Sequence, residues 1–321
     1  MIYPHKNPLG IDLEANLLKR KISFKEVWNK IIEKEDRPMT PRERIYPSEL
    51  GWSKIDTYYK MKAEPLTNPA NERSRRKFWS GDWEEYMVSW ILRCAGLKFT
   101  TQDRVLIELQ DCYPISGKID FIITGTTTPM SYDKEETPEF INEMIEKLST
   151  LFTEGDFQTT IMELKSQSVY AFEKTLNRGN PHLNHMLQLW CYKAYTGLPT
   201  LLVYDCRDDK RIEEFTIDNI EDELGDIVLV EAKEITYYAK NNIVPPKEKL
   251  ILFEDGKFGK NLKVEYSGYL TKLYSREVIE ETLEVDKNDK IITHKVKTIK
   301  NFELPMEYDK WAKSIVGKWN T

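Results

Sequence analysis

The 321-residue sequence lacks any apolar run that approaches the roughly 20 residues needed to span a lipid bilayer. Its N-terminal stretch, MIYPHKNPLGIDLEANLLKRK, also lacks the apolar segment of a secretory signal peptide. These two absences argue against an integral membrane protein. They lead us to expect a cytoplasmic protein, in a bacterium or in the host of a phage, with no membrane partner.

Cysteine is scarce, and the sequence has no CxxC spacing. The four cysteines are Cys94, Cys112, Cys191 and Cys206. In a reducing compartment we expect free thiols in the core. A four-cysteine metal or cluster site is the alternative, but such sites usually draw on clustered ligands.

Positive charge is not in excess, because 47 Lys and Arg stand against 53 Asp and Glu, giving a net charge of -6. This balance disfavours a protein that coats nucleic acid through bulk charge. It permits an enzyme with acidic metal ligands and a local basic track for phosphates. Aromatic residues make up 12% of the chain, and they can serve as core residues or as platforms for bases.

The hydrophobic pattern alternates between helical and strand-like periods. Helical spacing occurs in residues 22–36, 79–96, 139–152, 182–196 and about 218–240. Strand-like runs occur in 105–115, 117–125, 159–166, 200–205 and after the turn at 206–210, and again in KIITHKVKTIK. This order predicts an α/β fold with a mixed central sheet flanked by helices. We divide the chain into an N-terminal helical region at 1–69, a core at 70–217 and a C-terminal extension at 218–321.

The helix expected at 79–96 carries an apolar stripe that ends before Gly96. Its members recur at helical spacing and are Trp79, Trp83, Met87, Trp90 and Ile91. We expect this stripe to pack on the sheet and one polar edge of the helix to face a cleft. A second, shorter helix is expected through Ile55, Tyr58 and Tyr59, with Ser48 as its cap.

Three charged residues lie in two of the expected strands. Asp120 lies in the apolar run GKIDFIITG, where an unpaired carboxylate is costly. Glu163 and Lys165 are two apart in TTIMELKS and therefore share one face of a strand. Two carboxylates can bind Mg²⁺ or Mn²⁺, the Leu164 carbonyl can add a ligand, and Lys165 can orient or help deprotonate a water. This set predicts hydrolysis of a phosphodiester, although three incidental exposed charges would give the same pattern.

Four blocks, spread between about Tyr46 and Ile217, resemble the RecB-like branch of the PD-(D/E)xK nucleases. That branch includes phage exonucleases and CRISPR-associated nucleases. The blocks are Gly81–Glu85, Gly117–Asp120, Glu163–Lys165 and Gln188–Tyr192. The resemblance implies a restriction-endonuclease-like core at 70–217, with Asp120, Glu163 and Lys165 as the catalytic residues.

The resemblance also implies roles for residues outside this triad. Glu85 becomes a further metal ligand, with Asp82 or Glu84 as alternatives if the helix register shifts. Gln188 and Tyr192 would hold the DNA strand near the catalytic centre. His185 lies on the same helix face and could contact substrate or metal, or be a hydrogen-bonded structural histidine.

Basic and aromatic residues occur where a phosphate track would need them. The basic residues are Arg73, Arg75, Arg76 and Lys77 before the Glu85 helix, and Lys174 and Arg178 between the third and fourth blocks. Tyr170 and Phe172 are available to stack on bases. A solvated run of charge is the alternative for the first cluster.

One departure concerns the iron–sulfur cluster that many relatives bind through cysteines. Neither LGWSKIDTYY before the core nor KVEYSGYLTKLY after it contains cysteine. Because such a cluster needs thiolate ligands, we expect none here. Hydrophobic contacts are expected to close the C-terminal region instead.

We therefore expect a Mg²⁺- or Mn²⁺-dependent deoxyribonuclease. By family analogy it would be an exonuclease on single strands or DNA ends, in recombination, repair or phage DNA processing. One alternative is a catalytically silent DNA-binding protein, and another is a structural or assembly protein. A third is a structure-selective endonuclease. The C-terminal extension is a candidate surface for a protein partner or for oligomerisation.

Overall fold

The computed structural model describes residues 23, 29–30, 39–127, 138–152, 158–217, 220–249, 251–254, 257–274, 278–287 and 290–299. The helix expected at 22–36 therefore lies almost entirely outside the described residues, as do residues 300–321. Among the residues that are described, no helix is both long and apolar enough to cross a membrane.

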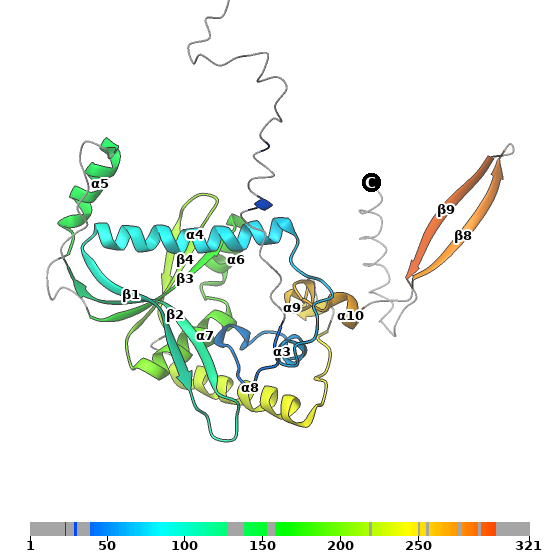
Figure 1. Cartoon of the computed structure of the whole chain (residues 1–321), viewed down its shortest axis with the longest axis horizontal. Helices are drawn as coiled ribbons and strands as arrows, with labels where there is room; N and C mark the ends of the chain where they lie inside the picture. The colour runs from blue at the N-terminus through cyan, green and yellow to red at the C-terminus, as the bar shows by residue number, and fades with distance from the viewer. Residues whose placement is uncertain are drawn as a thin grey trace, which may run out of the picture. The chain divides into compact units, whose positions relative to one another are not determined.

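A five-stranded mixed sheet forms the centre of the larger of two compact units (Figure 1). Its strands, in spatial order, are β1 (Leu97–Ile107), β2 (Ile115–Thr126), β3 (Thr160–Gln167), β4 (Thr200–Cys206) and β5 (Ile212–Phe215). β3 and β4 are parallel, and the other neighbouring pairs are antiparallel. The predicted α/β class with a mixed central sheet is confirmed.

Helices cover both faces of this sheet (Figure 1). The helices in contact with the strands are η1 (Pro47–Glu49), α4 (Glu72–Cys94), α6 (Val169–Arg178) and α7 (Leu183–Thr196). α5 (Glu139–Ser149) lies against α4, α8 (Glu221–Asn241) lies against α7, and α3 (Lys54–Met61) follows η1 in the chain. On one face, buried residues of α7 and α8 such as Leu187 and Val228 share a core with Ile119 and Leu202 of the sheet. On the other face, Val88 and Leu92 of α4 pack on a smaller cluster around Phe121, Leu164 and Val203.

Helix α4 begins earlier than the expected start near Trp79. The Asn71 side chain accepts a hydrogen bond from the Ser74 N–H at 2.9 Å and so caps the helix N-terminus. The run of four basic residues, expected to precede the helix, therefore lies within its first two turns.

Two further features of the structure differ from the prediction. Ser48 lies in η1 and does not cap α3, and α6 follows β3 in a segment that we had not assigned as helix.

The chain separates into two compact units. The first comprises residues 1–52, 57–64 and 70–244, so α8 packs with the sheet, whereas our boundary placed it in the extension.

All four cysteines are free, and Cys112 is half-buried while the other three are buried, as expected of reduced thiols.

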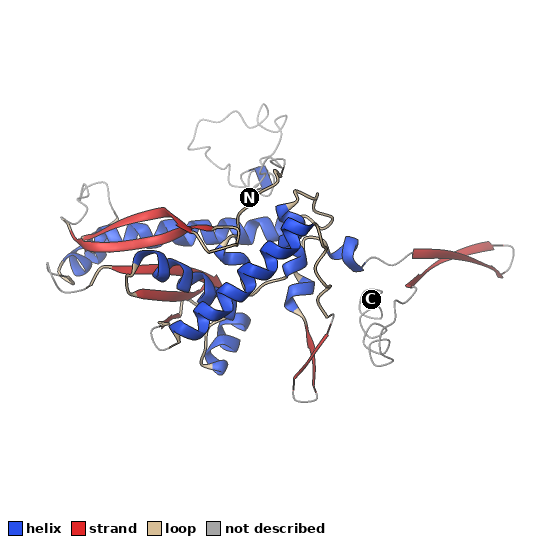
Figure 2. Ribbon diagram, turned by 90° about the horizontal axis from the view of Figure 1, so that it is seen from below, coloured by secondary structure: helices blue, strands red, loops and turns tan. Residues whose placement is uncertain are grey.

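The second unit comprises residues 53–56, 65–69 and 245–321. It contains α9 (Leu262–Glu265), α10 (Leu270–Tyr274) and two ribbons, β6 (Ile251–Glu254) with β7 (Lys257–Lys260) and β8 (Val278–Lys287) with β9 (Lys290–Ile299) (Figure 2).

A buried carboxylate holds two distant segments of this second unit together. Asp56 accepts hydrogen bonds from Ser267 Oγ at 2.7 Å, the Gly268 N–H at 3.1 Å and Ser53 Oγ at 3.3 Å. Buried Val264, Tyr269 and Leu273 supply apolar packing. A polar centre that we did not anticipate thus lies among buried apolar residues in this region.

Candidate active site

The candidate site lies where β2 and β3 separate. Their ladder pairs Phe121 with Met162 and continues only toward Thr160, so it ends one residue before Asp120 and Glu163 would meet. The Asp120 carboxylate takes the place of the next ladder bond, because its Oδ2 accepts a hydrogen bond from the Leu164 N–H at 3.1 Å. Two acidic residues are thereby held at the point where the strands open.

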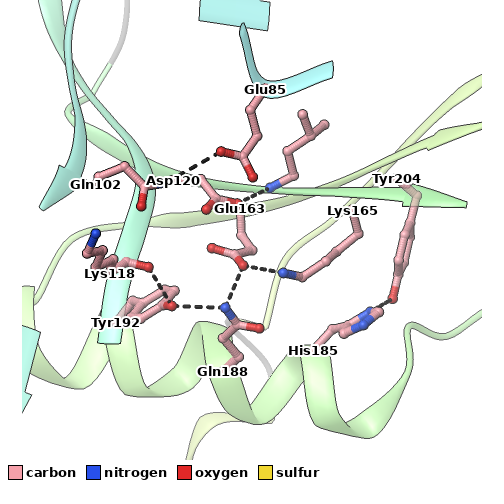
Figure 3. A network of polar contacts seen from close by, with 11 residues as sticks. Glu85, Gln102, Lys118, Asp120, Glu163, Lys165, His185, Gln188, Tyr192 and Tyr204 are labelled. Atoms are coloured by element: carbon pink, nitrogen blue, oxygen red, sulfur yellow. Dashed lines mark hydrogen bonds and ion pairs between the residues drawn. The ribbon is translucent and has the colours of Figure 1, made fainter. Parts of the chain in front are cut away.

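Glu163 is completely buried and is the centre of a polar network (Figure 3). Its Oε1 accepts hydrogen bonds from Lys165 Nζ at 2.5 Å and from Gln188 Nε2 at 2.6 Å. Its Oε2 is buried and receives no hydrogen bond from a nitrogen or hydroxyl donor, and the Glu163 carboxyl group lies close enough to that of Asp120 to share a proton with it. The structure thus brings the three expected catalytic residues together and leaves one carboxylate oxygen without such a donor.

Helix α7 supports this network from the other side (Figure 3). Gln188 also donates to the Tyr192 hydroxyl at 2.9 Å, and that hydroxyl donates to the Lys118 carbonyl at 2.7 Å. Gly117 lets η1 approach β2, because a Cβ at this position would lie 2.8 Å from Pro47, whereas the Tyr192 ring of α7 would be at an ordinary contact distance of 3.4 Å. Gln188 and Tyr192 are buried and bind protein groups, so in this geometry they position Glu163 and β2.

Glu85 reaches the site from α4 (Figure 3). Its Oε2 lies 3.5 Å from Gln102 Nε2, and its charge interacts with Asp120 and Lys165. Its neighbour Glu84 is buried elsewhere, in an ion pair with Lys210 at 2.6 Å. Between these two candidate ligands, the geometry favours Glu85, and Asp82 is exposed beside it.

The acidic groups of the site resist ionisation. Burial, reinforced by the charges of Asp120 and Asp82, raises the pKa of Glu85 to about 7. Burial also raises the pKa of Asp120, and it raises that of Glu163 to about 8 against the attraction of Lys165. Burial lowers the pKa of Lys165, but the nearby carboxylates outweigh it and the net direction is upward. The site is therefore short of positive charge.

These residues fit a hard divalent cation by their chemistry. Oxygen donors are the ligands that Mg²⁺ prefers, and Glu163 Oε2 is a buried oxygen without a nitrogen or hydroxyl donor. Among the residues that the structure describes, no three His, Cys, Asp or Glu side chains form a ready-made metal cage. Lys165 donates a hydrogen bond to one oxygen of Glu163, and Glu85 accepts one from Gln102, so both acids have protein partners in this geometry. The Leu164 carbonyl stays a predicted ligand.

His185 has a protein partner in this geometry. Its Nδ1 lies 2.7 Å from the Tyr204 hydroxyl, and burial, with help from Lys165, lowers the pKa of His185 well below its usual value. Arg178 lies 3.2 Å from the neighbouring His182 ring. Burial, followed by the charges of Arg178 and Lys174, lowers the pKa of His182 to about 4. Both histidines are thus neutral at pH 7.

The predicted basic and stacking residues divide into exposed and engaged groups. Lys174 and Tyr170 are exposed on α6, and the exposed fraction of Tyr170 is 77%. Arg178 is also exposed, but it donates to the Lys174 carbonyl and lies against His182. Phe172 is buried at 2%, so its expected role in base stacking is wrong, because it belongs to the core. In α4, Arg75 donates to the Ala70 carbonyl, and Arg76 binds Glu72 and Asn29.

A basic groove beside the site was not expected from the sequence. It has a volume of about 460 Å³ and is lined by Gln188, Tyr192 and three exposed cations, Arg44, Arg104 and Lys118. A larger hollow of about 690 Å³, over Tyr46 and Trp52, shares Arg44 with it. Of the three groove cations, only Lys118 lies inside one of the four sequence blocks. Arg104 lies beside Lys118 through the pairing of β1 with β2, which the sequence does not reveal.

No family model matches the chain, and no curated protein matches it in sequence. Solved structures with low sequence identity resemble its fold. SSO0001 is 14% identical, with coverage of 78% of this chain and 96% of its own, at a TM-score of 0.45. LHK-Exo in complex with dAMP is 13% identical; the match covers 68% of this chain and 94% of LHK-Exo, with a TM-score of 0.38. The alkaline exonuclease LHK-Exo from Laribacter hongkongensis is 14% identical; the match covers 68% of this chain and 97% of the exonuclease, with a TM-score of 0.30.

Proposed function

We propose that this protein is a metal-dependent nuclease that hydrolyses phosphodiester bonds in DNA. The observation that carries the proposal is the convergence of Asp120, Glu163 and Lys165 where β2 and β3 open, with Glu85 facing them from α4. Burying three acids around one lysine costs stability unless a ligand compensates. We therefore assign this arrangement to binding and catalysis.

Each residue has a chemical role in the proposal. Asp120, Glu163 and Glu85 would hold Mg²⁺ or Mn²⁺, with the Leu164 carbonyl as an additional donor. The bound cation supplies Lewis acidity toward the scissile phosphate. Lys165 exchanges its ion pair with Glu163 for the attacking water or a phosphoryl oxygen, and Gln188 keeps Glu163 oriented.

The basic groove supports a polyanionic substrate. Arg104 and Lys118 are direct cross-strand partners on β1 and β2, and like charges placed opposite each other destabilise a sheet. A phosphate backbone in the groove would relieve that repulsion. Because Gln188 lines the groove and donates to Glu163, a DNA strand in the groove would lie one side chain away from Glu163, although the net charge of the chain is negative.

We further propose exonuclease action on single strands or DNA ends, in recombination, repair or phage DNA processing. This finer assignment is supported by the resemblance of the four sequence blocks, which is an argument by analogy. An endonuclease with the same chemistry would cut closed circles, whereas a strict exonuclease cannot begin on them.

The test is digestion of end-labelled linear and closed circular DNA, single- and double-stranded, with Mg²⁺, Mn²⁺ or EDTA. We expect metal-dependent loss of linear DNA by the wild type and at least a hundredfold loss of rate in Asp120→Ala and Lys165→Ala. Asp226→Ala, an exposed acid on α8, is the matched control and should cleave normally.

Circular dichroism of each variant establishes that the fold persists. Full activity in the folded Asp120→Ala variant would contradict the assignment of these residues as the catalytic site. Absence of cleavage by the wild type with either metal would instead favour a silent DNA-binding or assembly protein.

A further inference from the structure

The face of helix α4 that packs on the sheet includes an acid. Val88 and Leu92 make the apolar contact of this face, and Glu84, one turn before Val88, lies on the same side of the helix. Glu84 is 6% exposed. Trp83, which we expected to pack on the sheet, is 53% exposed, so that prediction is wrong. A carboxylate therefore occupies a position where helix packing would call for an apolar side chain.

This acid is paired with a lysine from the turn between β4 and β5. Lys210 Nζ lies 2.6 Å from Glu84 Oε1. Lys210 has a left-handed backbone conformation, with φ 62°, and its N–H donates to the Cys206 carbonyl at 2.6 Å. Asp208 of the same turn accepts a hydrogen bond from the Val169 N–H, at the start of α6, at 2.7 Å. The turn is thus fixed to α6 and holds Lys210 against α4.

A second buried acid increases the need for this lysine. Asp205 of β4 is 8% exposed, and burial, followed by the charge of Glu84, raises its pKa. Neither Glu84 Oε2 nor Asp205 Oδ2 accepts a hydrogen bond from the residues that the structure describes. Without Lys210, Glu84 would keep a like-charged neighbour and lose its lysine partner. Removing one member of a buried ion pair leaves an uncompensated charge, which is strongly unfavourable, so we expect Glu84 to leave its place on the sheet.

The placement of Glu84 bears on the candidate site through its neighbour in the sequence. Glu84 and Glu85 are consecutive in α4, so their side chains leave the helix about 100° apart. Glu84 meets the turn after β4, while Glu85 faces Asp120 and Lys165 (Figure 3). An ion pair has a defined geometry, whereas apolar burial is non-directional. A rotation or slide of α4 that broke the ion pair would therefore also move Glu85.

From this arrangement we infer that Lys210 and Glu84 are positioning residues for Glu85, the ligand that α4 contributes to the proposed metal site. The inference rests on the proposed nuclease function. It gives the turn between β4 and β5 a role in metal binding, although none of its residues is a proposed ligand. Groups that hold a metal ligand in place typically change metal affinity or activity roughly 10–100-fold when they are removed.

The test is binding of Mn²⁺ to the full-length protein without DNA, measured by isothermal titration calorimetry. Lys210→Met keeps a long side chain but removes its charge, and we expect it to weaken Mn²⁺ binding by roughly tenfold or more. Glu84→Gln should act in the same direction. Lys210→Arg keeps a cation at this position and should retain most of the affinity. The matched control is Lys147→Met, which removes an exposed ion pair with Glu143 on α5 and should bind Mn²⁺ as the wild type does.

A double-mutant cycle separates positioning from a general loss of structure. Glu85→Ala should itself weaken Mn²⁺ binding, and Lys210→Met in that background should cause no further loss, because the residue through which it acts is absent. Equal losses in both backgrounds would overturn the inference and show that Lys210 only supports the fold. A loss in Glu84→Gln without one in Lys210→Met would also overturn it, and would make Glu84 itself a ligand. If circular dichroism shows that Lys210→Met is unfolded, the cycle is run with Glu84→Gln, which keeps the shape of the side chain.

The outcomes for the two proposals are separable. Mn²⁺ binding and cleavage that depend on Glu85 but not on Lys210 or Glu84 overturn the positioning role and leave the nuclease. Absence of both Mn²⁺ binding and cleavage in the wild type overturns both proposals.

Discussion

Glu163 is the residue at which the interactions of the site meet. It has no contact with solvent, its Oε1 accepts hydrogen bonds from Lys165 and Gln188, and its Oε2 has no nitrogen or hydroxyl donor. The Asp120 carboxyl group is the neighbour with which it can share a proton. A carboxylate in this position is stabilised either by a cation or by a proton. Burial raises the pKa of Glu163 to about 8. A metal ion that binds Glu163 below that pH therefore has to displace a proton from the carboxyl group.

This competition gives a prediction for pH. The pKa of Glu163 is raised from 4.5 to about 8, so between those values the folded state binds more protons than the unfolded state. The free energy of unfolding therefore falls as pH rises through that window and levels off above it. In EDTA, the melting temperature of the wild type should decrease from pH 5 to pH 8.

Glu163→Gln keeps the shape of the side chain but cannot ionise, so its melting temperature should decline less over the same range. The control is Glu223→Gln, an exposed acid on α8, which should follow the wild type. A decline in Glu163→Gln as steep as that of the wild type would contradict the shifted pKa. Added Mg²⁺ should raise the wild-type melting temperature more at pH 8 than at pH 6.

At the scale of elements, β2 combines packing and chemistry in a short stretch. Gly117 lies against Pro47 and Tyr192, and the Lys118 carbonyl accepts the Tyr192 hydroxyl. Asp120 then leaves the ladder to receive the Leu164 N–H. The spacing between Gly117 and Asp120 thus couples the position of α7 to the position of the carboxylate.

We predict that Gly117→Ala destabilises the protein by about 1–3 kcal/mol, the usual effect of overpacking, because its methyl group would lie 2.8 Å from Pro47. Urea unfolding measures this change. Gly81→Ala, where a Cβ meets nothing within 4 Å inside α4, should instead stabilise by up to about 1 kcal/mol. Pro47→Ala in the Gly117→Ala background should recover part of the loss, and strict additivity of the two changes would count against the contact.

Strands and helices with a strong period were accessible from the sequence. β3, β4, α7 and the mixed sheet follow the predicted pattern, and the three residues of the centre were identified by type and spacing. α6 was missed although it is strongly amphipathic, and α4 was misread because its stripe pointed to burial while Val88 and Leu92 make the sheet contact. The groove cations were missed because Arg44, Arg104 and Lys118 meet only through strand register and the placement of η1.

At the scale of the whole molecule, the chain builds its second unit from separate segments. Residues 53–56 and 65–69 join residues after 245 in one compact unit. Asp56, which is 2% exposed, links the first of these segments to Ser267 and Gly268, and the Gly268 carbonyl accepts hydrogen bonds from the Thr67 and Asn68 N–H groups of the second. Hydrogen bonds in which one partner is charged are shorter and stronger than those between neutral groups.

We predict that Asp56→Ala destabilises the second unit by about 1–3 kcal/mol for each buried donor left without a partner. Limited proteolysis should show earlier cleavage within residues 262–274, and hydrogen exchange of the Gly268 N–H should accelerate. Ser267→Ala removes one of these hydrogen bonds and should have a smaller effect. Unchanged proteolysis in Asp56→Ala would show that apolar packing alone closes the unit.

The Asp56–Ser267 hydrogen bond joins residues 211 positions apart. Since a ribosome adds roughly 5–20 residues per second, Asp56 exists for on the order of 10–40 s before its partner is made. During that interval the residues of the sheet unit, through α8, leave the ribosome first. The order of synthesis thus allows the unit with the candidate active site to fold before the second unit can close.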